Sequence, residues 1–405
     1  MTTRTPRTSA RRDQLTAIAA GLFARDGYHN VTVGDIAAAA GLSGPAIYRH
    51  FPGKQAILAE VVRSGFDEMA QVLAADLAGM SDPAERLRRT YRDLAAFVIR
   101  RPEFGVMWRR EYRHLAPEDA ADLAKRMGEA TDAVVAELRA LRPELEPADA
   151  ELVAWAALSV MGSISDHRVR LPRAAFEELL AGIAMDVVSV EFADVGGDNR
   201  PDEPAAGDRK EQILAAAARL FWDRGYHEVT LDEIGAAAGI AGPSVYSHFA
   251  GKTELLRTIT ERIGERLRQD LAESYAAAPD LRAPSAALTV LGDLTTRYVS
   301  TVLSSRDLVA AYFTEGHNLP DRDRAETRRF QRAYTARWCG LLGAANPSAS
   351  PEEIRIRVLA AFAVVNDTAR TRRLLERPGL AGRLRALMLA VLLTPVSEAR
   401  DVNRR

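Results

Sequence analysis

The chain has 405 residues, of which 47% are hydrophobic and 27% are charged, and its formal net charge at pH 7 is -1. This length predicts two or three soluble domains, and the single cysteine, Cys339, excludes an internal disulfide and a zinc site made of cysteines. No apolar run approaches the roughly 20 residues that span a bilayer, and the N-terminus lacks a secretory signal. We therefore expect a cytoplasmic protein with no membrane contact.

An internal repeat dominates the sequence. Residues 11–58 and 209–256 align without a gap at a constant shift of 198 and share 25 identities in 48 positions. Residues 193–208 are rich in Gly, Pro and acidic residues, which is typical of a linker. The chain is thus predicted to contain two copies of one unit.

The first elements of the repeat are short helices. Apolar residues at helical spacing predict a helix over about 11–26, with Gly27 at its end. Thr32 with Asp35, and Thr230 with Glu233, have the spacing of a capping box and predict a second short helix that ends at Gly41. A third helix is expected over 43–51, with Ser43 as its cap. Two short helices joined at a glycine form a helix-turn-helix.

The residues of this motif give a specific resemblance. The string Thr32-x-x-x-Ile36-Ala37-x-x-Ala40-Gly41-Leu42-Ser43-x-Pro45-x-x-Tyr48-x-His50-Phe51-x-x-Lys54, repeated over 230–252, resembles the DNA-binding signature of the TetR family of bacterial transcriptional regulators. The resemblance implies an all-α fold: two tandem units, each a three-helix DNA-binding head followed by a helical ligand-binding and dimerisation domain. The expected domains are 1–56 and 57–192, the linker 193–208, then 209–254 and 255–397.

The resemblance also implies which residues meet DNA. Residues 43–50 would form the recognition helix in the major groove, with Tyr48 and Lys54 at phosphates. Phe51 and His50 could equally serve core packing. The expected DNA-binding residues are Thr32, Ser43, Gly44, Pro45, Ala46, Tyr48, Arg49, His50 and Lys54 in the first copy, and Thr230, Gly242, Pro243, Ser244, Tyr246, Ser247, His248 and Lys252 in the second.

The two heads differ in charge. Residues 1–60 contain seven Lys or Arg and four Asp or Glu, a net +3, whereas residues 199–258 contain seven and nine, a net -2. Arg49 becomes Ser247, and the arm bearing Arg4 and Arg7 is replaced by an acidic stretch. Since phosphate contacts supply much of the affinity, we expect the first head to bind DNA more strongly, or the second to be a decayed copy.

The parts that follow the heads match at a shift of 204, from Glu111 to Glu315. Apolar patterns over 152–187 and 354–391 resemble the family's pairing helices. Candidate residues of a ligand pocket are Phe104, Trp108, Tyr112, Trp155 and Met161 in the first copy, and Tyr298, Tyr312, Phe313, Trp338 and Asn366 in the second. Arginines at 109, 110 and 113 and at 370, 372 and 373 fit an anionic effector such as an acyl-coenzyme A, or are simply solvated helix faces.

We therefore expect a sequence-specific DNA-binding regulator, most simply a ligand-responsive repressor with operator DNA and an unknown hydrophobic or anionic effector as partners. One chain could fold back as an intramolecular pseudo-dimer on an asymmetric operator, because a 16-residue linker reaches about 50 Å when extended; a homodimer is the other arrangement. The alternative is a helical interaction protein with degenerate heads. The sequence contains no catalytic or metal-binding spacing and no cofactor motif, so we expect no enzyme.

Overall fold

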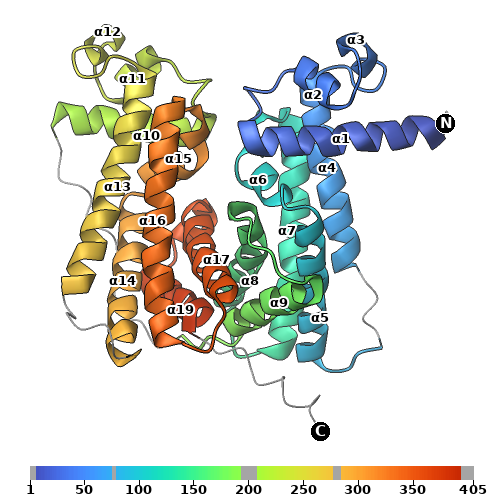
Figure 1. Cartoon of the computed structure of the whole chain (residues 1–405), viewed down its shortest axis with the longest axis vertical. Coiled ribbons are helices and arrows are strands. Elements are labelled where there is room, and N and C mark those ends of the chain that lie inside the picture. Colours follow the sequence, from blue (N-terminus) through green and yellow to red (C-terminus); the bar gives the residue numbers. More distant parts are fainter. Residues whose placement is uncertain (1–5, 75–78, 193–207, 277–283, 394–405) are drawn as a thin grey trace. The chain divides into compact units, whose positions relative to one another are not determined.

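The computed structural model describes residues 6–74, 79–192, 208–276 and 284–393, and these residues are helices and connecting turns with no strand (Figure 1). The expected linker 193–208, apart from Asp208, lies outside the described residues, as do Arg4 and residues 394–397. The chain divides into two compact units, Met1–Leu145 and Glu146–Arg405.

The first unit begins with the head and continues into a helical layer. Its helices are α1 (Pro6–Asp26), α2 (Val33–Ala39), α3 (Gly44–Ile47), α4 (Lys54–Leu73), α5 (Pro83–Arg100), α6 (Phe104–Arg109), the 3₁₀ turn η1 (Glu111–His114) and α7 (Pro117–Leu141). The helix predicted over 11–26 begins earlier, at Pro6. Helix α4 packs against α1, α5 and α7 and so joins the head to the layer behind it.

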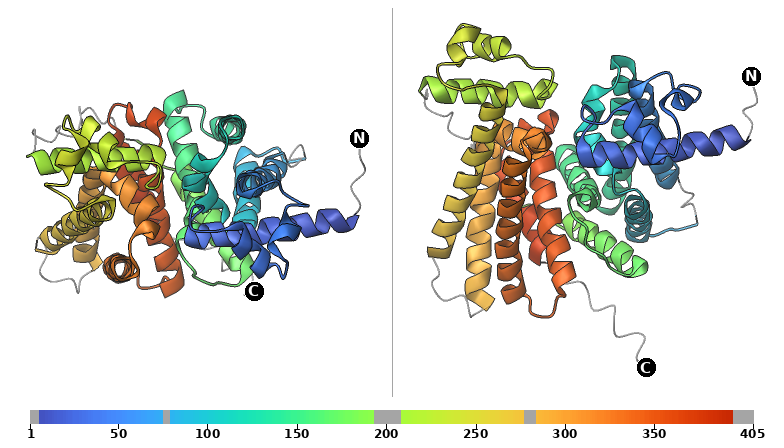
Figure 2. Two further views of the ribbon diagram at one scale, coloured as in Figure 1. Left: turned by 90° about the horizontal axis from the view of Figure 1, so that it is seen from above. Right: turned by 45° about the horizontal axis from the view of Figure 1, so that its top comes forward.

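The second unit contains the whole second copy and two helices from the first. In chain order these are α8 (Pro147–Gly162), η2 (Ser163–Asp166), α9 (Arg173–Val188), α10 (Arg209–Arg224), α11 (Leu231–Ala237), α12 (Gly242–Val245), α13 (Lys252–Ala276), α14 (Pro284–Ser304), α15 (Arg306–Glu315), η3 (Gly316–Asn318), α16 (Asp321–Ala345), α17 (Pro351–Ala369), α18 (Arg372–Leu375) and α19 (Leu380–Leu393). Helices α13, α14 and α16 lie side by side behind the second head (Figure 2).

Helices α8, α9, α17 and α19 form a four-helix bundle inside the second unit, because α8 packs on α9 and α17, and α19 packs on α9 and α17. Both α8 and α17 are apolar around most of their circumference, as expected of helices buried on several sides. The last two helices of the first copy thus pack against the corresponding helices of the second. For this reason the compact units and the sequence repeat divide the chain at different points.

Candidate nucleic-acid interface

The second helix of each head, α2 or α11, begins with the predicted capping box. The Thr32 side chain accepts a hydrogen bond from the Asp35 backbone N–H (3.1 Å), while the Asp35 carboxylate accepts one from the Thr32 backbone N–H (2.8 Å). Thr230 and Glu233 repeat both bonds, at 3.2 and 2.8 Å. These bonds lower the pKa of Asp35, and together with Arg224 they lower the pKa of Glu233 to about 2. The two capping-box predictions are confirmed.

The recognition helix is shorter than the sequence predicts. Helix α3 covers only residues 44–47, and the chain then continues as a turn in which the His50 N–H donates to the Ile47 carbonyl at 2.8 Å. Gly41 has φ +65°, a left-handed conformation that suits glycine and reverses the chain between α2 and α3. Ser43 occupies the cap position of α3, but its side chain makes no capping hydrogen bond.

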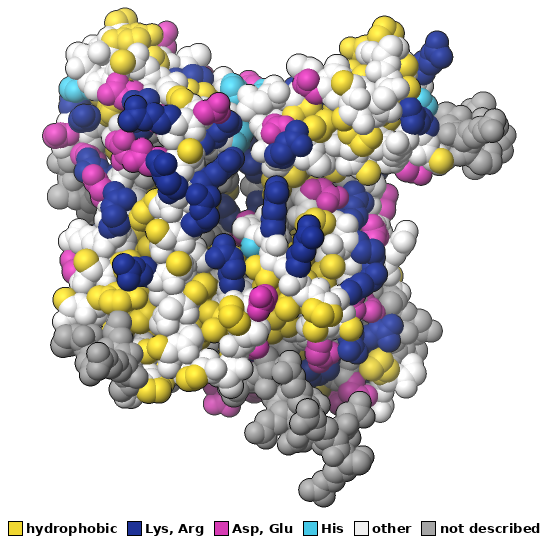
Figure 3. Space-filling model, viewed as in Figure 1, with side chains coloured by type: hydrophobic (Ala, Val, Ile, Leu, Met, Phe, Trp, Pro, Cys, Tyr) yellow, Lys and Arg dark blue, Asp and Glu magenta, His cyan; other side chains and the backbone are white. Residues whose placement is uncertain are grey.

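The tips of both heads expose aromatic side chains. Tyr48 is 59% exposed and Tyr246 is 62% exposed, among the few large apolar side chains so exposed in the described residues. Hydrophobic side chains gather on the protruding surfaces over α3 and α12 in Figure 3. More than half of each phenol is left uncovered by its own chain, so this position is suited to contact with another molecule.

Most of the other predicted DNA-facing residues share this exposure. Thr32, Ser43, Pro45 and Arg49 are exposed in the first copy and Thr230, Pro243, Ser244 and Ser247 in the second; Gly44, Ala46, His50 and His248 are half-buried, and Gly242 is buried. Phe51 and Phe249 are fully buried and belong to the cores of the heads. The His50 backbone carbonyl accepts a hydrogen bond from Arg12 at 2.5 Å, so this residue also has a structural role.

The ammonium groups of Lys54 and Lys252 donate hydrogen bonds to backbone carbonyls of their own heads. The Lys54 ammonium donates to the carbonyls of Tyr28 and Val31, both at 2.9 Å, and lies 4.3 Å from the centre of the Tyr28 ring. Burial lowers the pKa of Lys54, and the charge of Glu111 opposes that shift. Lys252 donates to the Tyr226 carbonyl at 2.8 Å. Two carbonyls therefore satisfy two of the three N–H donors of Lys54, and its contact with phosphate stays a prediction.

Comparison with known proteins agrees with this geometry. Residues 15–61 and 213–259 both match the model of bacterial regulatory proteins of the tetR family, and residues 80–167 match a tetracyclin repressor-like C-terminal domain. The HTH-type transcriptional repressor KstR2 of Rhodococcus jostii is 30% identical over 179 residues, which are 44% of this chain and 84% of that protein.

The chain belongs to the TetR family.

Two further proteins extend the comparison. The HTH-type transcriptional activator FasR of Mycolicibacterium smegmatis is 34% identical over 87 residues, 22% of this chain and 40% of that protein, so the chain spans less than half the activator's length. The TetR-family regulator PfmR of Thermus thermophilus matches with a TM-score of 0.38 and 25% identity, over 47% of this chain and 100% of PfmR. The two family matches and the similarity to KstR2 make this chain a TetR-family transcriptional regulator with two DNA-binding heads.

Each TetR head is joined to its helical layer through one buried glutamate. The Glu111 carboxylate accepts a hydrogen bond from the Tyr28 backbone N–H at 3.0 Å and pairs with Arg110, which donates to the Phe23 and Ala24 carbonyls at 2.9 and 3.0 Å. Glu315 accepts from the Tyr226 N–H at 3.2 Å in the second copy. The sequence repeat contains both glutamates, but only the fold shows that they meet the loop after the first helix of each head.

The two heads differ around the recognition helix. Arg49 is exposed, whereas the Ser247 hydroxyl donates to the Ser244 carbonyl of its own turn at 2.7 Å. A side-chain carbon added to Gly242 would lie 2.7 Å from the Asp232 Cα, while one added to Gly44 would meet nothing within 4 Å. The second recognition helix is therefore packed more tightly on its support.

The predicted pocket residues fall into separate clusters. Phe104 contacts Phe66 and Phe97 with ring centres 5.0 Å apart, and Trp108 stacks on Tyr112 at 5.2 Å. Met161 is buried in α8, and Trp155 lies under the Arg373 guanidinium, 5.4 Å from its ring centre.

In the second copy, Tyr298 and Trp338 pack with Phe362, and the Tyr298 hydroxyl donates to Asn366 at 3.1 Å, whereas Phe313 is 40% exposed. Tyr312 lines a groove between α13 and α16.

The arginine clusters have partners within the protein. Arg370 pairs with Asp367, Arg372 with Asp223 at 2.5 Å and Arg373 with Glu151 at 2.7 Å. These pairs explain the second cluster without an anionic effector. No described helix is long and apolar enough to cross a membrane.

Proposed function

We propose that this regulator is a ligand-responsive repressor whose chain folds back as a pseudo-dimer and places two unlike heads on an asymmetric operator. A TetR-family repressor, KstR2 of Rhodococcus jostii, is similar over 84% of its own length, which favours repression. A regulator of this kind would meet its operator DNA in the cytoplasm. The effector would shift the chain toward a conformation whose heads no longer fit the operator.

The observation that carries the proposal is the bundle of α8, α9, α17 and α19. In a symmetric dimer both partners supply the same residues to the interface. Here the first copy supplies acidic side chains and the second supplies arginines. Asp149 of α8 accepts hydrogen bonds from Arg377 at 2.9 Å and from Arg383 at 2.7 Å.

A second ionic contact lies deeper in the bundle. Arg357 of α17 is 1% exposed and donates to Asp186 of α9 at 3.3 Å, to Glu353 at 3.1 Å and to the Val391 carbonyl at 2.8 Å. A buried guanidinium needs such partners, because an unpaired buried charge is strongly destabilising.

These contacts favour unlike copies over like ones. At the shift of 204, Leu179 stands in the first copy where the second has Arg383, and Ala390 stands in the second where the first has Asp186. Pairing two first copies would leave Asp149 without that arginine, and pairing two second copies would deprive Arg357 of Asp186. Covalent linkage further favours the contact within one chain by raising the effective concentration, commonly to the millimolar range.

The unlike heads support an asymmetric operator. Arg49 can reach a phosphate or a guanine edge, and Ser247 cannot do so over the same distance. An operator read by such a pair would have one half-site bound mainly through the first head. The acidic second head also supports the rival function, an interaction protein with degenerate heads, and the same experiment separates the two.

The test is binding to DNA from upstream of the protein's own gene, over a salt series, for wild type, Arg49→Ala, Lys54→Ala and Lys252→Ala. A regulator predicts sequence-selective binding whose affinity falls with salt, and a shallower salt slope for Arg49→Ala. Arg173→Ala is the control, because Arg173 is exposed on α9, away from the heads, and pairs with Glu177 of its own helix. Binding that ignores DNA sequence and salt would favour the interaction protein.

A further inference from the structure

We propose that the second copy alone carries an effector site: a groove between α13 and α16 that binds a small carboxylate with an apolar body. The inference rests on the proposed ligand response and assigns it to one half of the chain. It follows from a difference between the two copies in residues that occupy equivalent positions.

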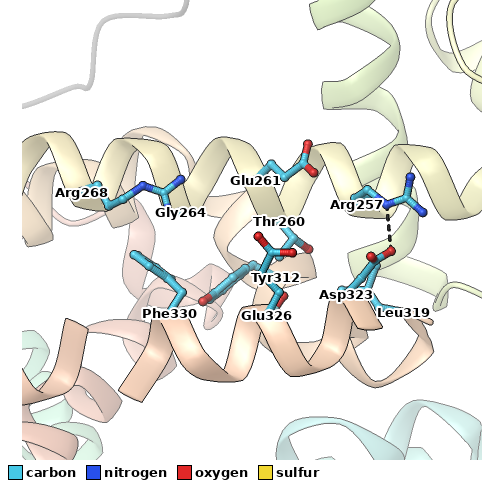
Figure 4. A pocket seen from close by; sticks show the side chains of 11 residues that line it. Arg257, Thr260, Glu261, Gly264, Arg268, Tyr312, Leu319, Asp323, Glu326 and Phe330 are labelled. Atoms are coloured by element: carbon cyan, nitrogen blue, oxygen red, sulfur yellow. Dashed lines mark hydrogen bonds and ion pairs between the residues drawn. The ribbon is translucent and has the colours of Figure 1, made fainter. Parts of the chain in front are cut away.

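The groove has a volume of about 80 Å³ and opens on the surface of the second unit. Its floor is the backbone of Gly264 in α13 and the phenol of Tyr312 in α15 (Figure 4). Phe330 of α16 forms one wall, and Arg268 lies beside it with the guanidinium 5.0 Å from the ring centre. Thr260 and Thr327 add hydroxyl groups to the lining.

The first copy fills the equivalent space with apolar side chains. Helices α4 and α13 both begin at the aligned lysine, so Gly264 stands where the first copy has Phe66, and Thr260 stands where it has Val62. Phe66 is 1% exposed and packs on Phe104 and on Trp108, with ring centres 5.0 and 5.8 Å apart. The glycine that the first copy does have nearby, Gly65, lies directly under the Phe104 ring.

Two polar groups in the groove are available to a ligand. The Tyr312 hydroxyl is buried, and no described polar atom meets it with good hydrogen-bond geometry. Burial raises the pKa of this phenol to about 12, and a weak interaction with the Gln331 side chain opposes that shift. In Figure 4 this hydroxyl is directed toward Phe330. Arg268 has no carboxylate within 4.0 Å in the described part of the chain. A buried phenol with at most a weak partner among the described residues can donate its proton to the carboxylate of a ligand.

The charged side chains around the groove favour an anion at the end where Arg268 lies. Arg257 is already paired with Asp323 at 2.8 Å, and the Glu261 carboxylate points away from α16 in Figure 4. Glu326 lies one helical turn before Phe330 and repels an anion at that end. A carboxylate would therefore bind Arg268 and the Tyr312 hydroxyl, while its apolar body would rest on Gly264 against Phe330.

The groove is connected to the second head. Leu319 lines it and is also part of the buried core formed by α10, α11 and α13 of that head. Tyr312 precedes by one turn Glu315, which holds the Tyr226 backbone N–H. A ligand in the groove would thus contact Leu319 of the second head's core and lie one helical turn from Glu315, so one effector per chain would act on that head first.

The experiment measures calorimetric binding of benzoate and phenylacetate to the full-length protein, with benzylamine as the ligand of opposite charge. Gly264→Phe restores the residue of the first copy, and Gly264→Ala is a milder change, since its added carbon would sit 3.6 Å or more from its neighbours. Arg268→Gln removes the charge. Arg257→Gln is the matched control, because that guanidinium is already paired.

We expect one carboxylate to bind per chain, to bind at least tenfold more weakly to Gly264→Phe and Arg268→Gln, and to be little affected by Arg257→Gln. DNA binding is measured on the same samples, so that loss of the regulator function is recognised separately. If neither carboxylate binds wild type more tightly than Gly264→Phe, or if benzylamine binds better, the groove is not this site even when DNA binding is intact.

Discussion

Removal of the Asp149 carboxylate should destabilise the four-helix bundle. The side chain is nearly buried and meets two guanidinium groups, those of Arg377 and Arg383, whose side chains are 11% and 22% exposed. Breaking a buried pair by removing one partner costs about 3–5 kcal/mol, and the partial exposure of Arg383 places Asp149→Ala near the lower value, about 3 kcal/mol. At roughly 2–4 °C per kcal/mol, the melting temperature should fall by about 6–12 °C.

The assay is thermal unfolding followed by circular dichroism at low protein concentration, with Arg173→Ala as control. That variant breaks an exposed pair within one helix and should change stability by at most about 0.5 kcal/mol. In a double-mutant cycle, the free energy of unfolding lost in Asp149→Ala/Arg383→Ala should be at least about 1 kcal/mol smaller than the sum of the two single losses, because the two residues are in contact. A shift for Asp149→Ala no larger than the control would refute the ionic account of unlike pairing.

Three further predictions test other parts of the structure. Arg49→Ala should weaken DNA binding about tenfold or more in a binding titration, because the arginine is charged, exposed and able to bind a guanine edge through two N–H groups. Ser247→Ala should have little effect, because the Ser247 hydroxyl is uncharged and already donates to the Ser244 carbonyl; equal losses would contradict the asymmetry of the heads. Glu111→Gln should lower the melting temperature of the first copy, because it removes the charge paired with Arg110 while keeping the shape, and an unchanged melting curve would show that this link is dispensable. Burial lowers the pKa of His167 from 6.5 to about 4, so the unfolded chain takes up a proton before the folded one does, and stability should fall as the pH drops from 6.5 toward 4; in His167→Asn that part of the pH dependence of unfolding should disappear.

The repeat and its local patterns predicted the fold well where the forces are local. The capping boxes at Thr32 and Thr230 each depend on two residues that are three positions apart, and the structure confirms both capping boxes. The recognition helix was predicted too long because residues 48–50 form a hydrogen-bonded turn after α3 and not a further helical turn. The spacing of apolar residues does not distinguish such a turn from the end of a helix.

Contacts between distant residues were not predictable from periodicity. Lys54 looked like a free cation at a helix start, yet it donates to carbonyls 26 and 23 residues earlier. The pairing of Asp149 with Arg383 joins residues 234 apart. No pattern in the sequence marks such a pair. A residue-by-residue comparison of the two copies does, however, show positions where their residues differ in size and polarity, as at Phe66 and Gly264.

Native mass spectrometry of the full-length protein with a short duplex from its own promoter tests the central proposal most directly. The account predicts one 405-residue chain per duplex, with two heads engaged, and a free protein that is monomeric in dilute solution. Two chains per duplex together with a free protein that is only dimeric would contradict the intramolecular pseudo-dimer, and the absence of any sequence-selective complex would contradict the regulator itself.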